Sequence, residues 1–521
     1  MYDFQDQIGF PILTVMTFLP ALAGVLMIAF MRGRPNWYKT TALIATGANF
    51  LLTFVILSAF DHYTADRQFV ENVPWIKSLG ISYHMGVDGI SVLMILLTTL
   101  LSLLIIPASW NYAKDKKELT FFAAFLFLET GMLGLFCARD LFMFYVFWEV
   151  MLIPMYFIIG VWGGPRRIYA AIKFFLFTLG GSLLMLVAIV AIAWLARPNP
   201  YATPVFDMDL LQTTLFSWNV QYWAFLAFFV AFAVKVPMWP LHTWLPDAHV
   251  EAPMAGSVIL AGVLLKVGGY GMLRICLPFF PDVVSTFVPY IMVLSIIAII
   301  YGALLSLVQK DIKKLVAYSS VSHMGFVTAG IFALNVVGIE GGILVMFSHG
   351  LLTGALFLMV GFLSERVHTR EISAMGGLAS PFPIMAGFLL FFTLASLGLP
   401  GLSGFVGEFL SLLGLFTYNK AMGAVAALGI ILAAAYLLWM FQRVMFTGLR
   451  DEKWRKLPDF SPREIVSLAP LGFLAIWAGV YPNTFIDLIH PPVIKLTERL
   501  APYMADGGST IHNIFASLGG F

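Results

Sequence analysis

Uninterrupted apolar runs of about eighteen residues or more recur along almost the whole of this 521-residue chain. A helix of that length crosses the roughly 30 Å of hydrocarbon in a bilayer. Of the residues, 60% are hydrophobic and 11% are charged, which is more apolar surface than a soluble core could bury. The period-two alternation of a transmembrane barrel is absent. The sequence therefore predicts an all-α polytopic membrane protein.

Fourteen apolar segments can be counted, and each is predicted to be a transmembrane helix. Their approximate limits are 8–30, 40–60, 86–107, 120–138, 140–160, 169–196, 221–240, 254–277, 285–308, 314–334, 341–363, 382–413, 422–446 and 465–487. No connection between them suggests a soluble domain, so the whole chain is expected to lie in or at the membrane.

The basic residues in the connections predict which side of the membrane each loop faces. Of the thirty Lys and Arg residues, twenty fall in one alternate set of loops, eight in the other set, and two inside the segments. Cytoplasmic loops carry an excess of Lys and Arg, so the richer set is predicted to be cytoplasmic and both termini to lie outside. The acidic start, MYDFQDQIGFP, is interpreted as neither a signal peptide nor a transit peptide.

Two segments contain helix-breaking residues. Lys235-Val236-Pro237 falls late in segment seven, and Gly398-Leu399-Pro400-Gly401 falls within segment twelve. Proline removes a backbone donor and clashes with the preceding turn, so both helices are predicted to be discontinuous. A packing kink would explain either break alone, but interrupted helices in corresponding positions of two halves are typical of transporters built on inverted repeats. An offset of five segments would invert the second unit relative to the first.

These breaks suggest a division of the chain into four parts. They are 1–119 with helices one to three, 120–280 with the first five-helix repeat, 281–447 with the second repeat, and 448–521 with a cytoplasmic loop, helix fourteen and a C-terminal tail.

Seven ionisable residues fall at depth within predicted spans, where inserting a charge costs about 2.5–3.5 kcal/mol or more. They are Glu129, Glu149, Lys235, Lys266, His323, His349 and Glu408. Groups of opposite sign at one depth could form a row parallel to the membrane and pass protons, because burial brings the proton affinities of lysine and carboxylate closer together.

Each of these residues also has a structural interpretation. A histidine can be a hydrogen-bonded packing residue, Glu149 and Lys235 can form a structural ion pair, and Glu129 can bond a neighbouring helix. Lys266 is the hardest to explain in this way, because from mid-helix it cannot easily reach either surface. A purely structural explanation for all seven together is disfavoured.

Five stretches resemble one known family, the antiporter-like membrane subunits of respiratory complex I. The most specific is VKVPMWPLHTWLPDAHVEAPMAGSVILAGVLLKVGGYG at 234–271. The others are FWEVMLIPMYFIIGVWGG at 147–164, KLVAYSSVSHMGFV at 314–327, MFSHGLLTGALF at 346–357 and SLGLPGLSGFVGEF at 396–409. The resemblance covers essentially the whole chain. The chain ends soon after segment fourteen, which favours the branch of the family without a long C-terminal extension and lateral helix.

The resemblance implies two inverted five-helix units and proton transfer along a central polar axis. By motif, Glu149 and Lys235 are similar to the family's ion pair, and Lys266 is similar to its central lysine. Glu129 has no such counterpart and rests on its depth alone, so it is tentative.

In the same way, His323 and His349 are similar to the family's connecting histidines, and Glu408 to the carboxylate where the proton leaves. Protons are expected to come in from the cytoplasm near Lys266 and broken segment seven. They would then cross to His323 and His349 and leave past Glu408. The helix breaks at Pro237, Gly398 and Pro400 would let water reach this row.

No redox cofactor is expected in this chain, since Cys137 and Cys276 form no metal-ligand pattern and no nucleotide-binding glycine pattern occurs. By the resemblance, NADH, FMN, iron–sulfur clusters and quinone belong to partner subunits, whose redox chemistry would drive this non-redox, proton-pumping subunit of an NADH:quinone oxidoreductase. The expected partners are other membrane subunits of complex I, with antiporter-like neighbours on both sides, together with lipids and protons. No nucleic acid is expected. The implied location is a bacterial cytoplasmic (inner) membrane, with both termini periplasmic.

Three alternatives remain open from the sequence. The chain could be a subunit of an Mrp-type sodium/proton antiporter, a subunit of a membrane-bound hydrogenase, or an inert scaffold that joins neighbouring subunits.

Overall fold

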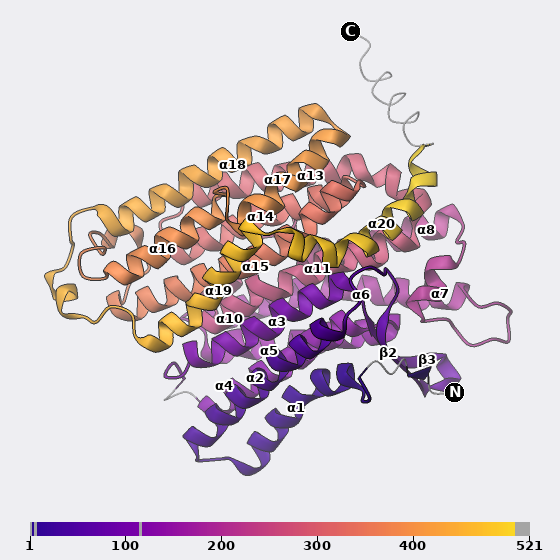
Figure 1. The fold of residues 1–521 in the computed structure, drawn as a ribbon, viewed down its shortest axis with the longest axis horizontal. Coiled ribbons are helices and arrows are strands. Elements are labelled where there is room, and N and C mark those ends of the chain that lie inside the picture. Colours follow the sequence, from indigo (N-terminus) through magenta and orange to yellow (C-terminus); the bar gives the residue numbers. More distant parts are fainter. Residues whose placement is uncertain (1–2, 5–7, 114–116, 506–521) are drawn as a thin grey trace, which may run out of the picture.

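Long helices run side by side through the whole molecule in this computed structural model, which describes residues 3–4, 8–113 and 117–505 (Figure 1). The N-terminal half contains α1 (Ile12–Phe30), α2 (Pro35–Ala59), α3 (Gly89–Ala108), α4 (Glu118–Cys137), α5 (Leu141–Trp162), α6 (Arg167–Leu195), α7 (Met208–Thr213), α8 (Trp218–Lys235), α9 (Trp244–Glu251), α10 (Met254–Ile259), α11 (Leu265–Gly271) and α12 (Leu277–Phe279). The C-terminal half contains α13 (Pro281–Leu307), α14 (Ile312–Phe332), α15 (Val336–Val367), α16 (Pro383–Ser396), α17 (Ser403–Tyr418), α18 (Lys420–Phe441), α19 (Pro462–Val480) and α20 (Asn483–Ala505).

Twelve helical segments of the described chain are long and apolar enough to cross a membrane. The two predicted segments outside that set are the seventh and the twelfth, and both are interrupted. Helix α8 ends at Lys235, and α9 begins only at Trp244. Helix α16 ends at Ser396, and α17 begins at Ser403. The prediction of an all-α polytopic bundle with two discontinuous helices is confirmed, and the architecture is compatible with fourteen crossings.

The connections gather at two ends of the bundle. At one end, here called the hairpin end, Met85 bridges Ala138 and Asp140 bridges Asp207. At the other, here called the basic-loop end, the Ile312 amide donates to the Arg370 carbonyl at 2.9 Å. The basic-loop end also holds the buried pair between Arg366 and Glu464, at 2.7 Å. The structure thus joins loops of the set that is rich in Lys and Arg at one end of the molecule.

The two predicted repeats share a local feature at opposite ends of the bundle. Asp140 caps α5 by accepting hydrogen bonds from two backbone amides of its first turn, and Asp311 caps α14 in the same way. Asp140 then bridges Asp207 after α6, whereas Asp311 bridges Glu371 after α15. The first bridge lies at the hairpin end and the second at the basic-loop end. The two predicted repeats thus make the same kind of contact at opposite ends of the bundle, which is compatible with an inverted repeat.

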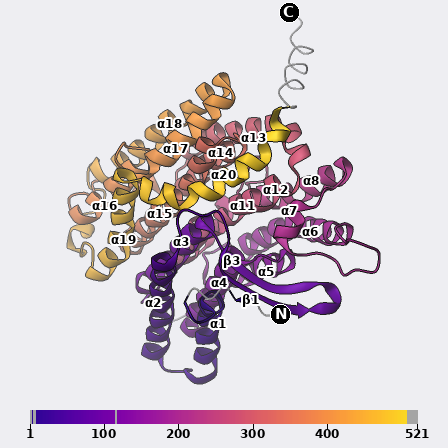
Figure 2. The same cartoon turned by 45° about the vertical axis from the view of Figure 1, so that its right-hand side comes forward.

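Two elements at the hairpin end were not expected from hydropathy. Strands β1 (Asp3–Phe4), β2 (Gln68–Ile76) and β3 (Ile81–Val87) form an antiparallel sheet in the order β1-β2-β3, with Asn72 paired to both Asp3 and His84. The predicted C-terminal tail continues from α19 as α20, which contacts both α3 and α15 (Figure 2). In α20, His490 pairs with Glu340 of α15 at 2.6 Å. Helix α20 therefore ties the second repeat to the rest of the bundle.

The break between α16 and α17 depends on a close approach that only glycine permits. A Cβ at Gly404 would lie 2.1 Å from the backbone oxygen of Ala395. The obstructing atom is backbone, so it cannot rotate away as a side chain could.

We predict that Gly404→Ala destabilises the assembled protein by about 1–3 kcal/mol, as expected for overpacking. The loss should appear as a lower thermal unfolding midpoint and less assembled complex in the membrane. Gly387→Ala is the matched control, because a Cβ at this position of α16 meets nothing within 4 Å. Equal midpoints for the two variants would contradict the proposed constraint.

Candidate functional site

Lys266 lies at the centre of the bundle in the irregular helix that crosses it. Its segment, α11, is flanked by two π-helical stretches, η2 (Leu260–Leu264) and η3 (Met272–Cys276). Such wide turns often occur at functional sites, because they redirect side chains and free carbonyl groups. Here Lys266 Nζ donates to the carbonyl of Ala261, five residues earlier. The ammonium is therefore drawn toward the basic-loop end.

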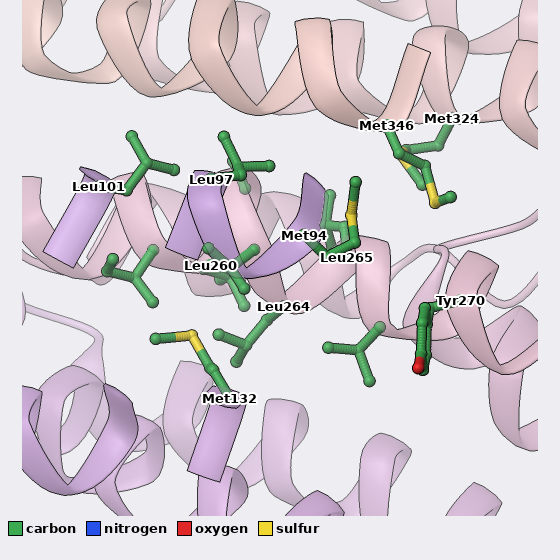
Figure 3. Close-up of a cluster of buried hydrophobic side chains, with 14 of the residues drawn as sticks. Met94, Leu97, Leu101, Met132, Leu260, Leu264, Leu265, Tyr270, Met324 and Met346 are labelled. Atoms are coloured by element: carbon green, nitrogen blue, oxygen red, sulfur yellow. The ribbon is translucent and has the colours of Figure 1, made fainter. Parts of the chain in front are cut away.

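The helix that carries Lys266 contributes Leu264, Leu265 and Tyr270 to a cluster of buried apolar side chains (Figure 3). The other labelled members of this cluster are Met94, Leu97, Leu101, Met132, Leu260, Met324 and Met346. Lys266 itself is fully buried, and its second polar contact is His349 Nδ1 at 2.6 Å. With so few acceptors, His349 is the natural destination for a proton that leaves Lys266.

The row continues from His349 to the carboxylate of Glu408. The rings of His349 and His323 lie 5.7 Å apart between centroids. His323 Nδ1 then contacts Glu408 Oε1 at 2.5 Å. The spatial order is therefore Lys266, His349, His323 and Glu408. The order of the two histidines in space is thus the reverse of their order along the chain.

A small cavity lies against the end of this row. Its volume is about 10 Å³, close to the space that a single water needs, and it is lined by His349, Ser396 and Glu408 among others. His349 Nε2, Ser396 Oγ and Glu408 Oε2 are buried and have no hydrogen-bond partner among the described residues. These atoms could all bond to water in the cavity.

The other half of the predicted row is not in direct contact. Lys235 Nζ has no hydrogen-bond partner within the described chain and lies 5.4 Å from the ring centre of Trp148 and 5.6 Å from that of Phe174. Glu149 is close enough for its charge to act on this ammonium, but the two form no ion pair within 4.0 Å. Aromatic faces stabilise a cation more weakly than a carboxylate contact would. Lys235 is thus held more weakly than an ion pair with Glu149 would hold it.

Both helix breaks border a charged residue. Lys235 is the last residue of α8, directly before Val236 and Pro237. In the second break, Gly398 adopts a φ of +85°, which a side chain would strain. A Cβ at Gly398 would lie 3.7 Å from Glu408 Oε2. Pro400 follows in the same turn.

Glu129 is fully buried but is held by other elements. Its Oε1 accepts a hydrogen bond from Asn49 Nδ2 of α2 at 3.1 Å, and Asn49 also donates to the carbonyl of Met16. Among the described residues, Glu129 forms no hydrogen bond or ion pair with the other six, so its inclusion in the row stays a prediction.

Sequence reasoning missed two buried residues near the row. Tyr436 of α18 contacts His323 Nε2 through its hydroxyl at 3.2 Å. His249 of α9 is fully buried, and its ring stacks on the ring of Phe357 with 4.6 Å between the two centroids. Neither ring nitrogen of His249 has a hydrogen-bond partner among the described residues. His249 lies in the 234–271 motif, so the sequence could have indicated that it belongs near the site. Tyr436 lies in an apolar run, and nothing in the sequence indicated a role for it.

In the described part of the chain no three His, Cys, Asp or Glu side chains gather as a metal site requires.

Interrupted helices beside a buried row of ionisable groups define a membrane protein of the ion-translocating class. Residues 138–433 match the family described as NADH:quinone oxidoreductase/Mrp antiporter, TM, and the chain belongs to this family. It is 48% identical to NADH-quinone oxidoreductase subunit M of Rhodobacter capsulatus over 508 residues, which cover 96% of this chain and 98% of that protein.

Solved structures agree with this assignment. A chain of respiratory complex I from Thermus thermophilus with bound NADH superposes with a TM-score of 0.85 and 33% identity, covering 94% of this chain and 99% of that one. A chain of the Mrp complex from a Dietzia species gives a TM-score of 0.81 at 20% identity, covering 95% of this chain and 99% of that one. The second likeness concerns the fold alone.

The Tyr436 contact generates a prediction about His323. When His323 Nδ1 bonds to Glu408, Nε2 can accept from the Tyr436 hydroxyl if the ring is neutral or donate to its oxygen if the ring is protonated. Tyr436→Phe removes both options and should slow proton pumping about two- to tenfold, which is the effect of one neutral hydrogen bond.

The measurement is NADH-driven acidification of inverted membrane vesicles, normalised to assembled complex. Tyr290→Phe is the control, since Tyr290 of α13 is 66% exposed. Equal pumping by both variants would remove Tyr436 from the site.

Proposed function

We propose that this chain is the proton-translocating, non-redox subunit M of a bacterial NADH:quinone oxidoreductase. The observation that carries the proposal is the run of buried contacts from Lys266 through His349 and His323 to Glu408. Membership of the family and the near full-length match to a relative named subunit M support it.

The same relationship supplies the proposed setting. NADH, FMN, iron–sulfur clusters and quinone would belong to partner subunits, and antiporter-like membrane subunits would flank this one on both sides. The chain would span the bacterial cytoplasmic membrane with the basic-loop end inside and the hairpin end, with both termini, in the periplasm. The excess of Lys and Arg in one set of loops supports this orientation.

Proton uptake is proposed at the basic-loop end. A cavity of about 470 Å³ opens there beside the junction of α9 and α10, and its lining includes Glu251 and Lys313. Lys313 is buried and donates to the carbonyl of Ala252 at 2.5 Å. Lys266 Nζ is also directed toward this end of the bundle through its contact with the Ala261 carbonyl, which supports uptake from this cavity.

Transfer then follows the contacts. A proton on Lys266 Nζ can pass to His349 Nδ1 along the 2.6 Å contact. His349 can release it through Nε2 into the small cavity, from which His323 and Glu408 are reached. His323 and Glu408 share the last short contact, so the proton leaves the row at Glu408.

Lys235 and Glu149 are proposed to control when Lys266 releases its proton. While Lys235 pairs with Glu149, its charge is compensated; when the pair opens, the free ammonium disfavours a second cation at Lys266. Two unit charges 4 Å apart interact by about 4 kcal/mol at an effective dielectric constant of 20. Moving one charge against about 150–180 mV requires about 3.5–4 kcal/mol. The two magnitudes are comparable, so gating of one proton by one rearranged ion pair is energetically feasible.

Two alternative functions can each be tested by a separate experiment. An Mrp-type sodium/proton antiporter subunit would support ²²Na⁺ flux without NADH, whereas the proposed subunit would not. A hydrogenase subunit would purify with a hydrogenase instead of an NADH-oxidising complex. The 48% identical relative favours the NADH:quinone oxidoreductase.

We predict that Lys266→Ala and Glu149→Gln each slow proton translocation about a hundredfold or more, as expected when a proton-transfer group or its trigger is removed. Lys266→Arg should also be poor, because arginine does not readily release its proton. Pumping is measured as NADH-driven acidification in reconstituted vesicles that contain equal amounts of assembled complex.

Lys456→Ala and Glu452→Gln are the matched controls, because both residues are exposed in the loop before α19. They should pump like the unaltered protein. Full pumping with Glu149→Gln would contradict the proposed gating role of Glu149. Full pumping with Lys266→Ala would show that the buried row does not carry protons, as in an inert scaffold.

A further inference from the structure

A second cavity lies at the hairpin end, remote from the proposed uptake route. Its volume is about 450 Å³. It is enclosed by the segment before β2, the start of α3, α7, the end of the irregular α10–α12 helix, and α20. The N-terminal half of the chain thus supplies most of the lining residues, and α20 supplies the others.

Cationic side chains outnumber carboxylates around this cavity. Its lining includes four cations and three carboxylates, which are Arg67, Arg274, Lys495, Arg499, Asp66, Asp88 and Asp209. Directly behind the lining, the buried Arg139 pairs with Asp209 and also interacts with the charge of Asp207. The lining residues therefore carry one positive charge in excess.

The carboxylates are already committed to partners. Asp88 pairs with both Arg67 and Arg274 and also accepts from the amides of Ile90 and Ser91 at 3.1 Å. Asp66 pairs with Lys495 at 3.0 Å. Every carboxylate that lines the cavity therefore already pairs with a cation, and none is left to neutralise the remaining cation.

Arg499 retains capacity for an anion. It donates to the carbonyls of Pro278 and Gln212 and forms no ion pair with a carboxylate in the described residues. Arg274 also lines the cavity, but it is 6% exposed and already pairs with Asp88. Oxyanions are the groups that best satisfy the donors of a guanidinium group.

The lining groups outside the spans remain charged at neutral pH. Burial, together with the nearby Arg139 and Arg274, lowers the pKa of Arg67 to about 10. Burial alone would raise the pKa of Asp88, but Arg274 and Arg67 overcome it and hold that pKa well below its usual range. Arg67 stays cationic and Asp88 anionic, so the excess of positive charge is permanent.

We propose that this cavity binds a phosphate-type oxyanion, either free phosphate or the headgroup of an anionic phospholipid. Guanidinium groups present paired donors that match phosphate oxygens. Ile90, Leu273 and Leu496 also line the cavity, and they offer apolar contact for the glycerol part of a lipid. The bound anion would join Arg499 of α20 to cationic residues of the N-terminal half of the chain that line the cavity, and so fasten α20 to the bundle.

The test measures anion binding to the purified complex and needs no turnover, so its outcome is independent of the pumping proposal. Delipidated complex is titrated with ³³P-labelled inorganic phosphate, and separately reconstituted with phosphatidylglycerol and analysed by native mass spectrometry. The variants are Arg499→Gln, which removes the unpaired guanidinium, and Lys495→Gln, which removes an exposed cation at the mouth. Lys77→Gln is the matched control, because Lys77 is exposed at the same end but outside the cavity.

One phosphate or one phosphatidylglycerol per complex should be lost in Arg499→Gln, with affinity about tenfold or more lower, as for one charged hydrogen bond. Lys495→Gln should weaken binding by a smaller factor, and it provides the test if Arg499→Gln fails to assemble. Lys77→Gln should bind the anion normally. Retention of phosphate alone assigns the site to the free anion, and retention of phosphatidylglycerol alone assigns it to lipid. Binding of both ligands that is unchanged in Arg499→Gln and Lys495→Gln, or no binding in the unaltered complex, would overturn the proposal.

Discussion

The rest of the structure depends on how the ammonium group of Lys266 is accommodated in an apolar interior. A buried charge is costly unless it is paired and hydrogen-bonded. Among the described residues, Lys266 contacts the Ala261 carbonyl of a π-helical turn and one ring nitrogen of His349. The irregular helix from α10 to α12 thus places a backbone acceptor within reach of the buried ammonium. Under the proposed function, this small number of partners would leave the Lys266 proton free to transfer.

The two helix breaks solve a related problem at each side of this centre. Unwound backbone at membrane depth is tolerated only where protein or water satisfies it. At the first break the chain turns directly after Lys235, and at the second Gly398 and Gly401 adopt positive φ angles beside Glu408. Each break thus lies next to a charged group that also needs polar surroundings. One interruption of the helix serves both needs.

Much of this could be predicted from the sequence, because hydropathy and proline positions act locally. Segments seven and twelve are interrupted where Pro237 and Pro400 predicted. The order of the histidines could not be predicted, since it depends on how α14 and α15 pack. The open arrangement of Lys235 against Trp148 depends on a rotamer, which no motif encodes. Helix α20 was missed because it is amphipathic: its buried apolar residues recur at helical spacing with charged residues between them, so its average hydropathy is too low to predict a span.

The two halves of the row differ in a way that assigns them different tasks. From Lys266 to Glu408 the groups lie in contact or beside a water-sized cavity, so a proton can move by short transfers without large side-chain motion. Between Lys235 and Lys266 there is no such contact, and long flexible lysines are held by aromatic faces and single carbonyls. A conductor needs close, fixed partners, whereas a switch needs partners that can be exchanged at low cost. Under the proposed function, the first half would therefore act as the switch and the second half as the conductor.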